Sequence, residues 1–102
     1  MTIQETLQST GLPCVYSHFK KKGEVRKPPY ITYIGSGQLN LDADNTHYWR
    51  ENTYQVEYYF KDKDESAEAA IEDALLENGY LYDKSEDIYL EEENVFLIYY
   101  YI

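Results

Sequence analysis

The side chains that most often carry out catalysis or bind metal ions are sparse in this chain and lie far apart. The 102 residues include one cysteine, Cys14, and two histidines, His18 and His47, which are 29 positions apart. A protein zinc site needs several Cys, His or carboxylate ligands at short, regular spacings, so we predict no metal site. Cys14 has no partner for a disulfide within the chain. We expect it to pack as a small buried hydrophobic residue, with a reactive thiol as the alternative.

Motifs for nucleophilic catalysis and for phosphate binding are also missing. Ser36 lies directly between Gly35 and Gly37, which is not the spacing of a nucleophile elbow. No lysine and no helix pattern follow these glycines, as a phosphate-binding loop would require. The 19 acidic residues give many carboxylate pairs, but a catalytic pair needs environments that separate two pKa values. We therefore predict that the chain is not an enzyme and binds no cofactor.

Charge is unevenly distributed along the chain. Residues 1–50 carry a formal charge of +2 and residues 51–102 carry −12, giving the total of −10. Five bases lie within eight residues: Lys20, Lys21, Lys22, Arg26 and Lys27. The acidic remainder would repel nucleic acid, so we predict no sequence-specific nucleic-acid binding. We interpret this basic segment, residues 20–27, as a contact for an acidic neighbour or for the acidic half of another copy; a solvated surface is the alternative.

The first half of the chain predicts a short helix and two strands. The helix spans residues 2–10, with Thr2 and Glu5 spaced for a capping box. The strands span residues 14–19 and 30–34, and Gly35 and Gly37 are expected to end the second one. Residues 36–52 then form a long polar loop, which in a small domain often makes contacts. Leu39 and Leu41 alternate within it, and a short strand extension there is an alternative. Within this loop, Tyr48, Trp49 and Arg50 are candidate contact residues, although Trp49 folding back onto the core is an equal alternative.

The second half predicts a strand joined directly to an amphipathic helix. In the strand at residues 53–61, Tyr54, Val56, Tyr58 and Phe60 alternate toward one face. The helix spans residues 65–78, with Asp62 or Asp64 as its N-cap and Gly79 as its stop. Its apolar stripe comprises Ala67, Ala70, Ile71, Ala74 and Leu75. Acidic residues cover the other side, and two of them, Glu68 and Glu72, are candidate partner contacts.

The remaining residues complete an α+β domain. We expect a strand start at residues 80–82, a polar break at residues 83–87, a short strand at residues 88–90 and a turn at residues 91–94. The last strand, residues 95–102, is apolar on both faces, which is typical of a central or covered strand. These elements predict a single domain over residues 1–102, with a mainly antiparallel sheet of four to five strands, one main helix on one face and a short N-terminal helix.

Two further patterns concern surfaces and location. The 13 tyrosines suit half-buried sheet faces and also subunit interfaces. No apolar run reaches the roughly 18 residues of a membrane span, and the first residues lack the pattern of a signal peptide. We therefore expect no membrane association.

The order of these elements resembles that of the small tail-terminator or tail-completion proteins, the neck proteins of long-tailed bacteriophages and prophages. The resemblance covers residues 28–35 (PPYITYIG), 44–61 (DNTHYWRENTYQVEYYFK) and 65–101, which begin ESAEAAIEDALLENG and end KSEDIYLEEENVFLIYYY. It implies a structural subunit with no catalytic residues. Six copies would form a ring that caps the tail tube and joins it to the head connector. The partners implied are therefore further copies, the tail-tube protein and the head-connector protein, in the virion or in the host cytoplasm during assembly.

A second hypothesis comes from the acidity of the chain. A small acidic protein can inhibit or bind a host protein by presenting carboxylates in the manner of nucleic acid. Under the ring hypothesis, the predicted contact residues are Lys20, Lys21, Lys22, Arg26, Lys27, Tyr48, Trp49, Arg50, Glu68 and Glu72. The two hypotheses differ in symmetry, because a ring subunit self-associates whereas an acidic mimic binds a basic partner.

Overall fold

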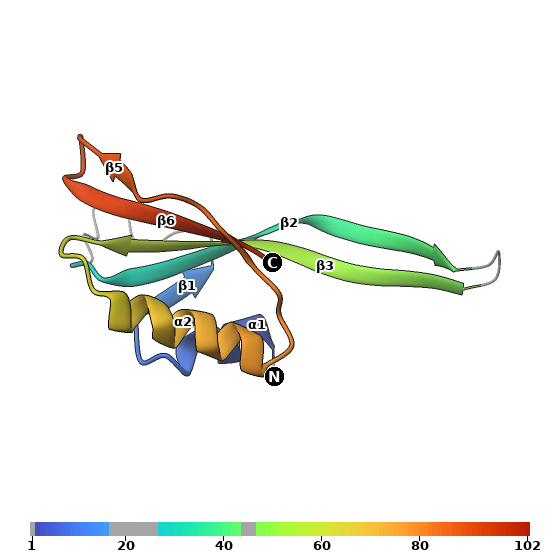
Figure 1. Cartoon of the computed structure of the whole chain (residues 1–102). Coiled ribbons are helices and arrows are strands. Elements are labelled where there is room, and N and C mark those ends of the chain that lie inside the picture. Colours follow the sequence, from blue (N-terminus) through green and yellow to red (C-terminus); the bar gives the residue numbers. More distant parts are fainter. Residues whose placement is uncertain (1, 17–26, 44–46) are drawn as a thin grey trace.

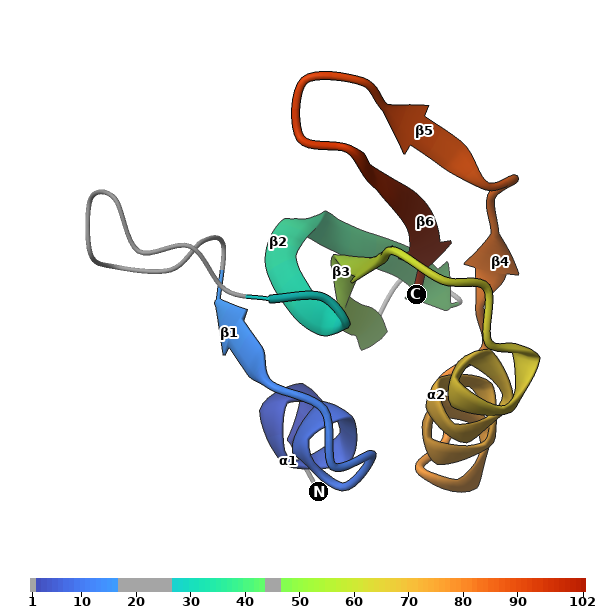
Figure 2. The ribbon, with the colours of Figure 1, turned by 90° about the vertical axis from the view of Figure 1, so that its left-hand side faces the viewer.

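The computed structural model shows an α+β domain in which two helices lie on one face of a six-stranded mixed sheet (Figures 1 and 2). It describes residues 2–16, 27–43 and 47–102, with the backbone alone for residues 38–43 and 47–51. The elements in chain order are α1 (Ile3–Gln8), β1 (Cys14–Tyr16), β2 (Tyr30–Ala43), β3 (His47–Phe60), α2 (Glu65–Glu77), β4 (Asp83–Lys84), β5 (Ile88–Leu90) and β6 (Val95–Tyr101). The strand order is β1-β2-β3-β6-β4, and β5 also pairs with β6. The predicted fold class is confirmed.

The N-terminal helix forms for the reason that its sequence indicates. Thr2 is the N-cap, and its hydroxyl accepts a hydrogen bond from the Glu5 amide while the Glu5 carboxylate accepts one from the Thr2 amide. This reciprocal pair satisfies two backbone donors that a helix start otherwise leaves without partners. Ile3 and Leu7 are then buried one turn apart against the core. Strand β1 follows and pairs with β2 in parallel; residues 17–19 of the predicted strand lie outside the described residues.

The prediction of a long polar loop at residues 36–52 is wrong. Strand β2 continues to Ala43, and β3 already begins at His47, so that this segment is a β-hairpin. The glycines at 35 and 37 do not end the strand, because a local shift of register between them accommodates the irregular backbone. Polar side chains do not prevent pairing here, since the cross-strand hydrogen bonds come from the backbone and satisfy each strand whatever its side chains are.

The outer half of this hairpin projects from the body as an arm, which we define as residues 36–43 and 47–53 (Figure 1). Nearer the body, Gly35 is paired with Tyr54, and the backbone of Tyr54 exchanges two hydrogen bonds with that of Ile102, at the end of β6. Beyond that point, the described residues of the two strands pair with each other alone. The arm contributes to a molecule that measures 50 × 30 × 24 Å.

The core lies between the sheet and α2, as the strand–helix pattern predicts. Val56, Tyr58 and Phe60 are buried on the sheet side, while Ile71 and Leu75 are buried on the helix side. Asp64 is the N-cap and accepts hydrogen bonds from the amides of Ser66 and Ala67. The predicted stripe is wrong at Ala70, which is exposed. The helix instead turns Glu68 inward, and this residue is only 3 % exposed.

The C-terminal strands form the other side of the sheet. The prediction of a strand start at residues 80–82 is wrong; the short strand β4 lies within the predicted polar break instead. One reason is that the Tyr80 amide donates to the carbonyl of Leu75, which holds that residue in the C-terminal cap of α2. Strand β6 pairs with β3 on one side and with β4 and β5 on the other. Its predicted central position is confirmed.

Candidate functional site

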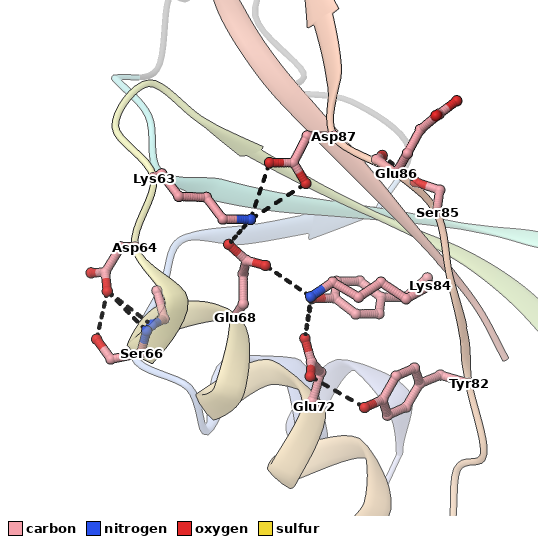
Figure 3. A network of polar contacts seen from close by, with 12 residues as sticks. Lys63, Asp64, Ser66, Glu68, Glu72, Tyr82, Lys84, Ser85, Glu86 and Asp87 are labelled. Carbon is pink, nitrogen blue, oxygen red and sulfur yellow. Dashed lines mark hydrogen bonds and ion pairs between the residues drawn. The ribbon is translucent and has the colours of Figure 1, made fainter.

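A cluster of ion pairs joins α2 to the edge of the sheet (Figure 3). The Lys84 ammonium lies 2.8 Å from Glu68 Oε1 and 2.9 Å from Glu72 Oε2. The Lys63 ammonium lies 2.8 Å from Glu68 Oε2 and 3.0 Å from Asp87 Oδ2. Two lysines therefore share three carboxylates, and we call this group the helix-edge cluster.

Three separate pieces of the chain bring the helix-edge cluster together. The Asp64 cap sets the start of α2, which places Glu68 and Glu72 one turn apart on the same side of the helix. Lys63 comes from the turn before the helix and Lys84 comes from β4. The cluster also reaches the core, because the hydroxyl of the buried Tyr100 donates to Glu72 Oε2 at 2.8 Å. The contacts hold α2 against both β4 and β6.

The pKa shifts of four groups in the helix-edge cluster, Lys63, Glu68, Glu72 and Lys84, favour their ionised forms. Burial by itself raises the pKa of Glu68 and of Glu72, but hydrogen bonds from the lysines outweigh it and the pKa of each carboxyl is lowered. Burial likewise acts to lower the pKa of Lys84, but its hydrogen bonds to Glu68 and Glu72 raise that pKa overall. A general acid or base works best with a pKa near the working pH. These shifts move away from neutrality, so the cluster is suited to holding structure together and not to proton transfer.

The opposite face of the sheet carries a different group, which we call the tyrosine face. Its side chains come from β2, β3 and β6, and the register places them side by side. They are Tyr30, Thr32, Gln55, Glu57, Tyr59, Tyr99 and Tyr101. Both helices pack against the other side of the sheet (Figures 1 and 2). Two ring pairs stack here: Tyr30 on Tyr59, with centroids 4.8 Å apart, and Tyr99 on Tyr101, with centroids 5.8 Å apart.

Glu57 lies in the middle of the tyrosine face and is half-buried. Its Oε2 accepts hydrogen bonds from the hydroxyls of Thr32 and Tyr59, both at 2.8 Å, and its Oε1 accepts one from Gln55 Nε2 at 3.0 Å. Burial raises the pKa of Tyr59, and the hydrogen bond and negative charge of Glu57 raise it further. Burial also raises the pKa of Tyr99, and the Glu57 charge adds to that shift.

Most of the predicted contact residues lie apart from both of these groups. Lys20, Lys21, Lys22 and Arg26 lie outside the described residues, and Lys27 is exposed just before β2. Tyr48, Trp49 and Arg50 belong to the arm, where β3 pairs with β2. The arm thus contains three of the predicted contacts in one projecting element. Whether any of these residues touches a partner stays a prediction.

Glu68 and Glu72 are the predicted contacts whose side-chain partners the structure describes. They were expected to lie on a solvated acidic side of the helix, and that expectation is wrong for Glu68, because it is buried beneath two lysines. Glu72 is half-buried against Lys84, Tyr82 and Tyr100. The exposed acids of α2 are Glu65, Asp73 and Glu77. A partner contact through Glu68 or Glu72 would therefore have to compete with bonds inside the chain.

Sequence reasoning missed Lys63, Lys84 and Glu57. The spacing of Glu68 and Glu72 shows that they share a side of the helix, but nothing near Lys84 in the sequence indicates that β4 carries it to them. Glu57 shares the strand face of Gln55 and Tyr59, so alternation alone gives its neighbours on β3. Its hydrogen bond with Thr32 depends on the register between β2 and β3, which alternation does not supply.

Comparison with known proteins gives no relative. No protein-family model, no curated protein and no solved structure matches the chain. None of the helices in the described part of the chain is long and apolar enough to cross a membrane. In the same residues, no group of three or more His, Cys, Asp or Glu side chains is placed to hold a metal ion. Cys14 is half-buried against the core, and burial raises the pKa of its thiol to about 11, which favours packing over reactivity.

Proposed function

We propose that this chain is a structural virion-assembly protein. In this proposal it is a phage tail-terminator or tail-completion subunit, which caps the tail tube as a ring and joins it to the head connector. The proposal rests on the resemblance of its element order to neck proteins. The structural observation that carries its assembly part is the arm.

The arm is an element whose geometry suits contact with another molecule. With seven residues paired on each strand from Gly37 to Ala43, it extends roughly 20 Å at about 3.4 Å per residue. An isolated two-stranded ribbon is only marginally stable in water. Its outer edges also present backbone donors and acceptors that can pair with another chain. Docking on a neighbouring molecule would satisfy these backbone groups and stabilise the ribbon.

The charges of the domain body also support assembly. Glu68 and Glu72 are neutralised inside the helix-edge cluster, yet exposed acids remain on α2 and at the turn formed by Glu91, Glu92 and Glu93. The basic segment at residues 20–27 offers the opposite charge. A subunit with separate acidic and basic surfaces attracts further copies in a fixed orientation.

The same exposed acids favour a second candidate, the acidic mimic of nucleic acid. A mimic needs many carboxylates without internal partners, and Glu68, Glu72 and Asp87 are instead paired with lysines. It also has no use for a projecting β-ribbon. We therefore rank the ring subunit first, and the experiment below separates the two.

The test is a variant in which the arm is shortened without touching the body. Gln38 and Asn52 are partners across the hairpin, so an Asn-Gly turn in place of residues 39–51 would close the two strands directly. We expect thermal unfolding of the body to stay within a few degrees of the wild type. Mass measurement and electron microscopy should show wild-type rings, near 73 kDa for six copies of 12.1 kDa, and no rings for the short-arm variant.

Two results would contradict the proposal. A wild-type protein that stays monomeric at all concentrations and binds basic proteins would favour the acidic mimic. A short-arm variant that forms rings as the wild type does would remove the arm from the argument. The genes beside this one give an independent check on the phage role, because a tail-terminator gene is expected next to genes for head adaptors and the tail tube.

A further inference from the structure

The Glu57 carboxylate on the tyrosine face retains capacity for one more hydrogen bond. An ionised carboxylate has two oxygens with about two acceptor positions each. Both positions of Oε2 are used by the hydroxyls of Thr32 and Tyr59, whereas Oε1 accepts one bond, from Gln55. One position on Oε1 is therefore left. A lysine ammonium is a point charge that can use a single acceptor, whereas an arginine fork prefers both oxygens.

The surroundings of Glu57 lack a positive charge among the described residues. Every carboxylate of the helix-edge cluster has a lysine within 3.0 Å. Among the described residues Glu57 has no such lysine, and its three hydrogen bonds come from neutral groups. Partial burial of a carboxylate without a counter-ion costs free energy. Binding of a cation from another molecule would offset that cost. Tyrosine rings on both sides of Glu57 would add cation–π attraction for the same ligand.

We propose that the tyrosine face binds a lysine from the basic segment, residues 20–27, of a second copy of this chain, with Glu57 as the receiving carboxylate. This inference rests on the proposed function in one respect, because it takes self-assembly as the setting. It specifies which surface of the neighbouring copy the basic segment binds.

Charge complementarity selects the occupant. The basic segment holds five of the nine bases in the chain, and the lysines among them are Lys20, Lys21, Lys22 and Lys27. Lys27, the one lysine of this segment within the described residues, is exposed. Of the other described lysines, Lys63 and Lys84 already serve the helix-edge cluster, and Lys61 is a single exposed lysine followed by Asp62. In a two-fold dimer this contact would form twice, with each copy both donating and receiving, whereas in a head-to-tail arrangement each copy donates to the next. Heterologous contacts close into rings when the rotation between copies allows it.

Two variants separate the donor from the receiver. Glu57→Gln keeps the shape of the side chain and an acceptor oxygen but removes its charge, so this protein can only donate. The fourfold change Lys20→Glu, Lys21→Glu, Lys22→Glu, Lys27→Glu removes every lysine of the basic segment but leaves the tyrosine face unchanged, so this protein can only receive. Glu65→Gln is the matched control, because it removes one exposed carboxylate from α2. Thermal unfolding checks that all three variants are folded.

Sedimentation of each protein up to about 1 mM measures its association. We expect each of the two variants alone to associate at least about tenfold more weakly than the wild type, as loss of a charged contact with cation–π support implies. Their equimolar mixture should recover pairs, and the recovery should fall at about 0.5 M salt, where charge attraction is screened. The Glu65→Gln protein should associate as the wild type does.

The outcomes distinguish this contact from the proposed function. If Glu57→Gln associates within twofold of the wild type, or if the mixture associates no better than the separate variants, the Glu57 contact is refuted. Rings that persist in Glu57→Gln would refute the contact and leave the ring proposal standing. A wild-type protein that shows no association up to about 1 mM would overturn the contact as well, since Glu57 would then have no second copy to bind.

Discussion

Replacement of Lys84 by methionine tests the helix-edge cluster most directly. Lys84 contacts both Glu68 and Glu72, and its loss leaves Glu72 without a lysine while Glu68 keeps Lys63. Breaking a fully buried pair costs about 3–5 kcal/mol, whereas an exposed pair contributes about 0–1 kcal/mol. The Lys84 side chain is 34 % exposed and the Glu68 side chain 4 %. We therefore expect a loss between these limits, about 2 kcal/mol in the free energy of unfolding.

Chemical denaturation followed by circular dichroism measures this loss, which corresponds to a fall in melting temperature of about 10 °C for a domain of this size. Lys61→Met is the matched control. Lys61 is exposed in the same turn as Lys63, and we expect its replacement to change the stability by less than about 0.5 kcal/mol. Equal effects of the two substitutions would refute the view that the cluster holds α2 to the sheet.

The pH dependence of the Lys84→Met effect provides a second check. The pKa values of Glu68 and Glu72 are lowered in the folded protein from an ordinary value of 4.5. A lowered pKa means that the carboxylates stabilise the fold above that value and that this contribution is lost as the pH falls through the folded-state pKa. The difference between wild type and Lys84→Met should therefore be full at pH 7 and should shrink as the pH falls below 4.5. A difference that stays constant down to about pH 2 would show that packing, and not charge, explains the loss.

Two further predictions concern α2 and its end. Ile71→Asp should unfold the domain, because Ile71 is 0 % exposed and a charge would be buried beneath the helix; a folded, soluble variant seen by circular dichroism would contradict the packing of α2. Gly79→Ala should lower the free energy of unfolding by about 1 kcal/mol, because Gly79 has a φ of +85°, which disfavours any residue with a Cβ. A Cβ at this position would meet no atom within 4 Å, so backbone strain and not a steric clash is the expected cause. Gly35→Ala, where φ is not positive and the nearest atom is an ordinary 3.6 Å away, should cost less than half as much in the same denaturation assay.

The elements that carry a strong local signal could be predicted from the sequence. The capping box of Thr2 and Glu5, the alternation from Tyr54 to Phe60 and the cap of α2 at Asp64 each depend on residues within a few positions of one another. The arm could not be recognised, because glycines at 35 and 37 are normally read as the end of a strand, whereas here a register shift absorbs them. Leu39 and Leu41 do alternate with polar residues in this segment, but two apolar positions are a weak signal beside the largely polar run of residues 42–47.

Less of the candidate sites than of the fold could be predicted from the sequence. The helix-edge cluster needs Lys84, which lies 16 residues after Glu68, and the tyrosine face needs the register of three strands. Ala70 was predicted inside and Glu68 outside, and the structure reverses both. The reason is that Lys63 and Lys84 make it favourable to bury the carboxylate, and hydrophobicity scales do not include such partners.

Strand β6 is central in the sheet, yet it is the last of the described strands to be translated. Its partners in β3 lie far upstream; Tyr58, for example, pairs with Ile98, 40 residues later. While β6 is still inside the ribosome, the edge of β3 that will pair with β6 has no partner strand. The domain is therefore expected to complete its fold only after Val95 to Tyr101 emerge. Each newly made copy thus passes through an unfinished stage in which β3, one of its two longest strands, offers an open edge to other nascent chains.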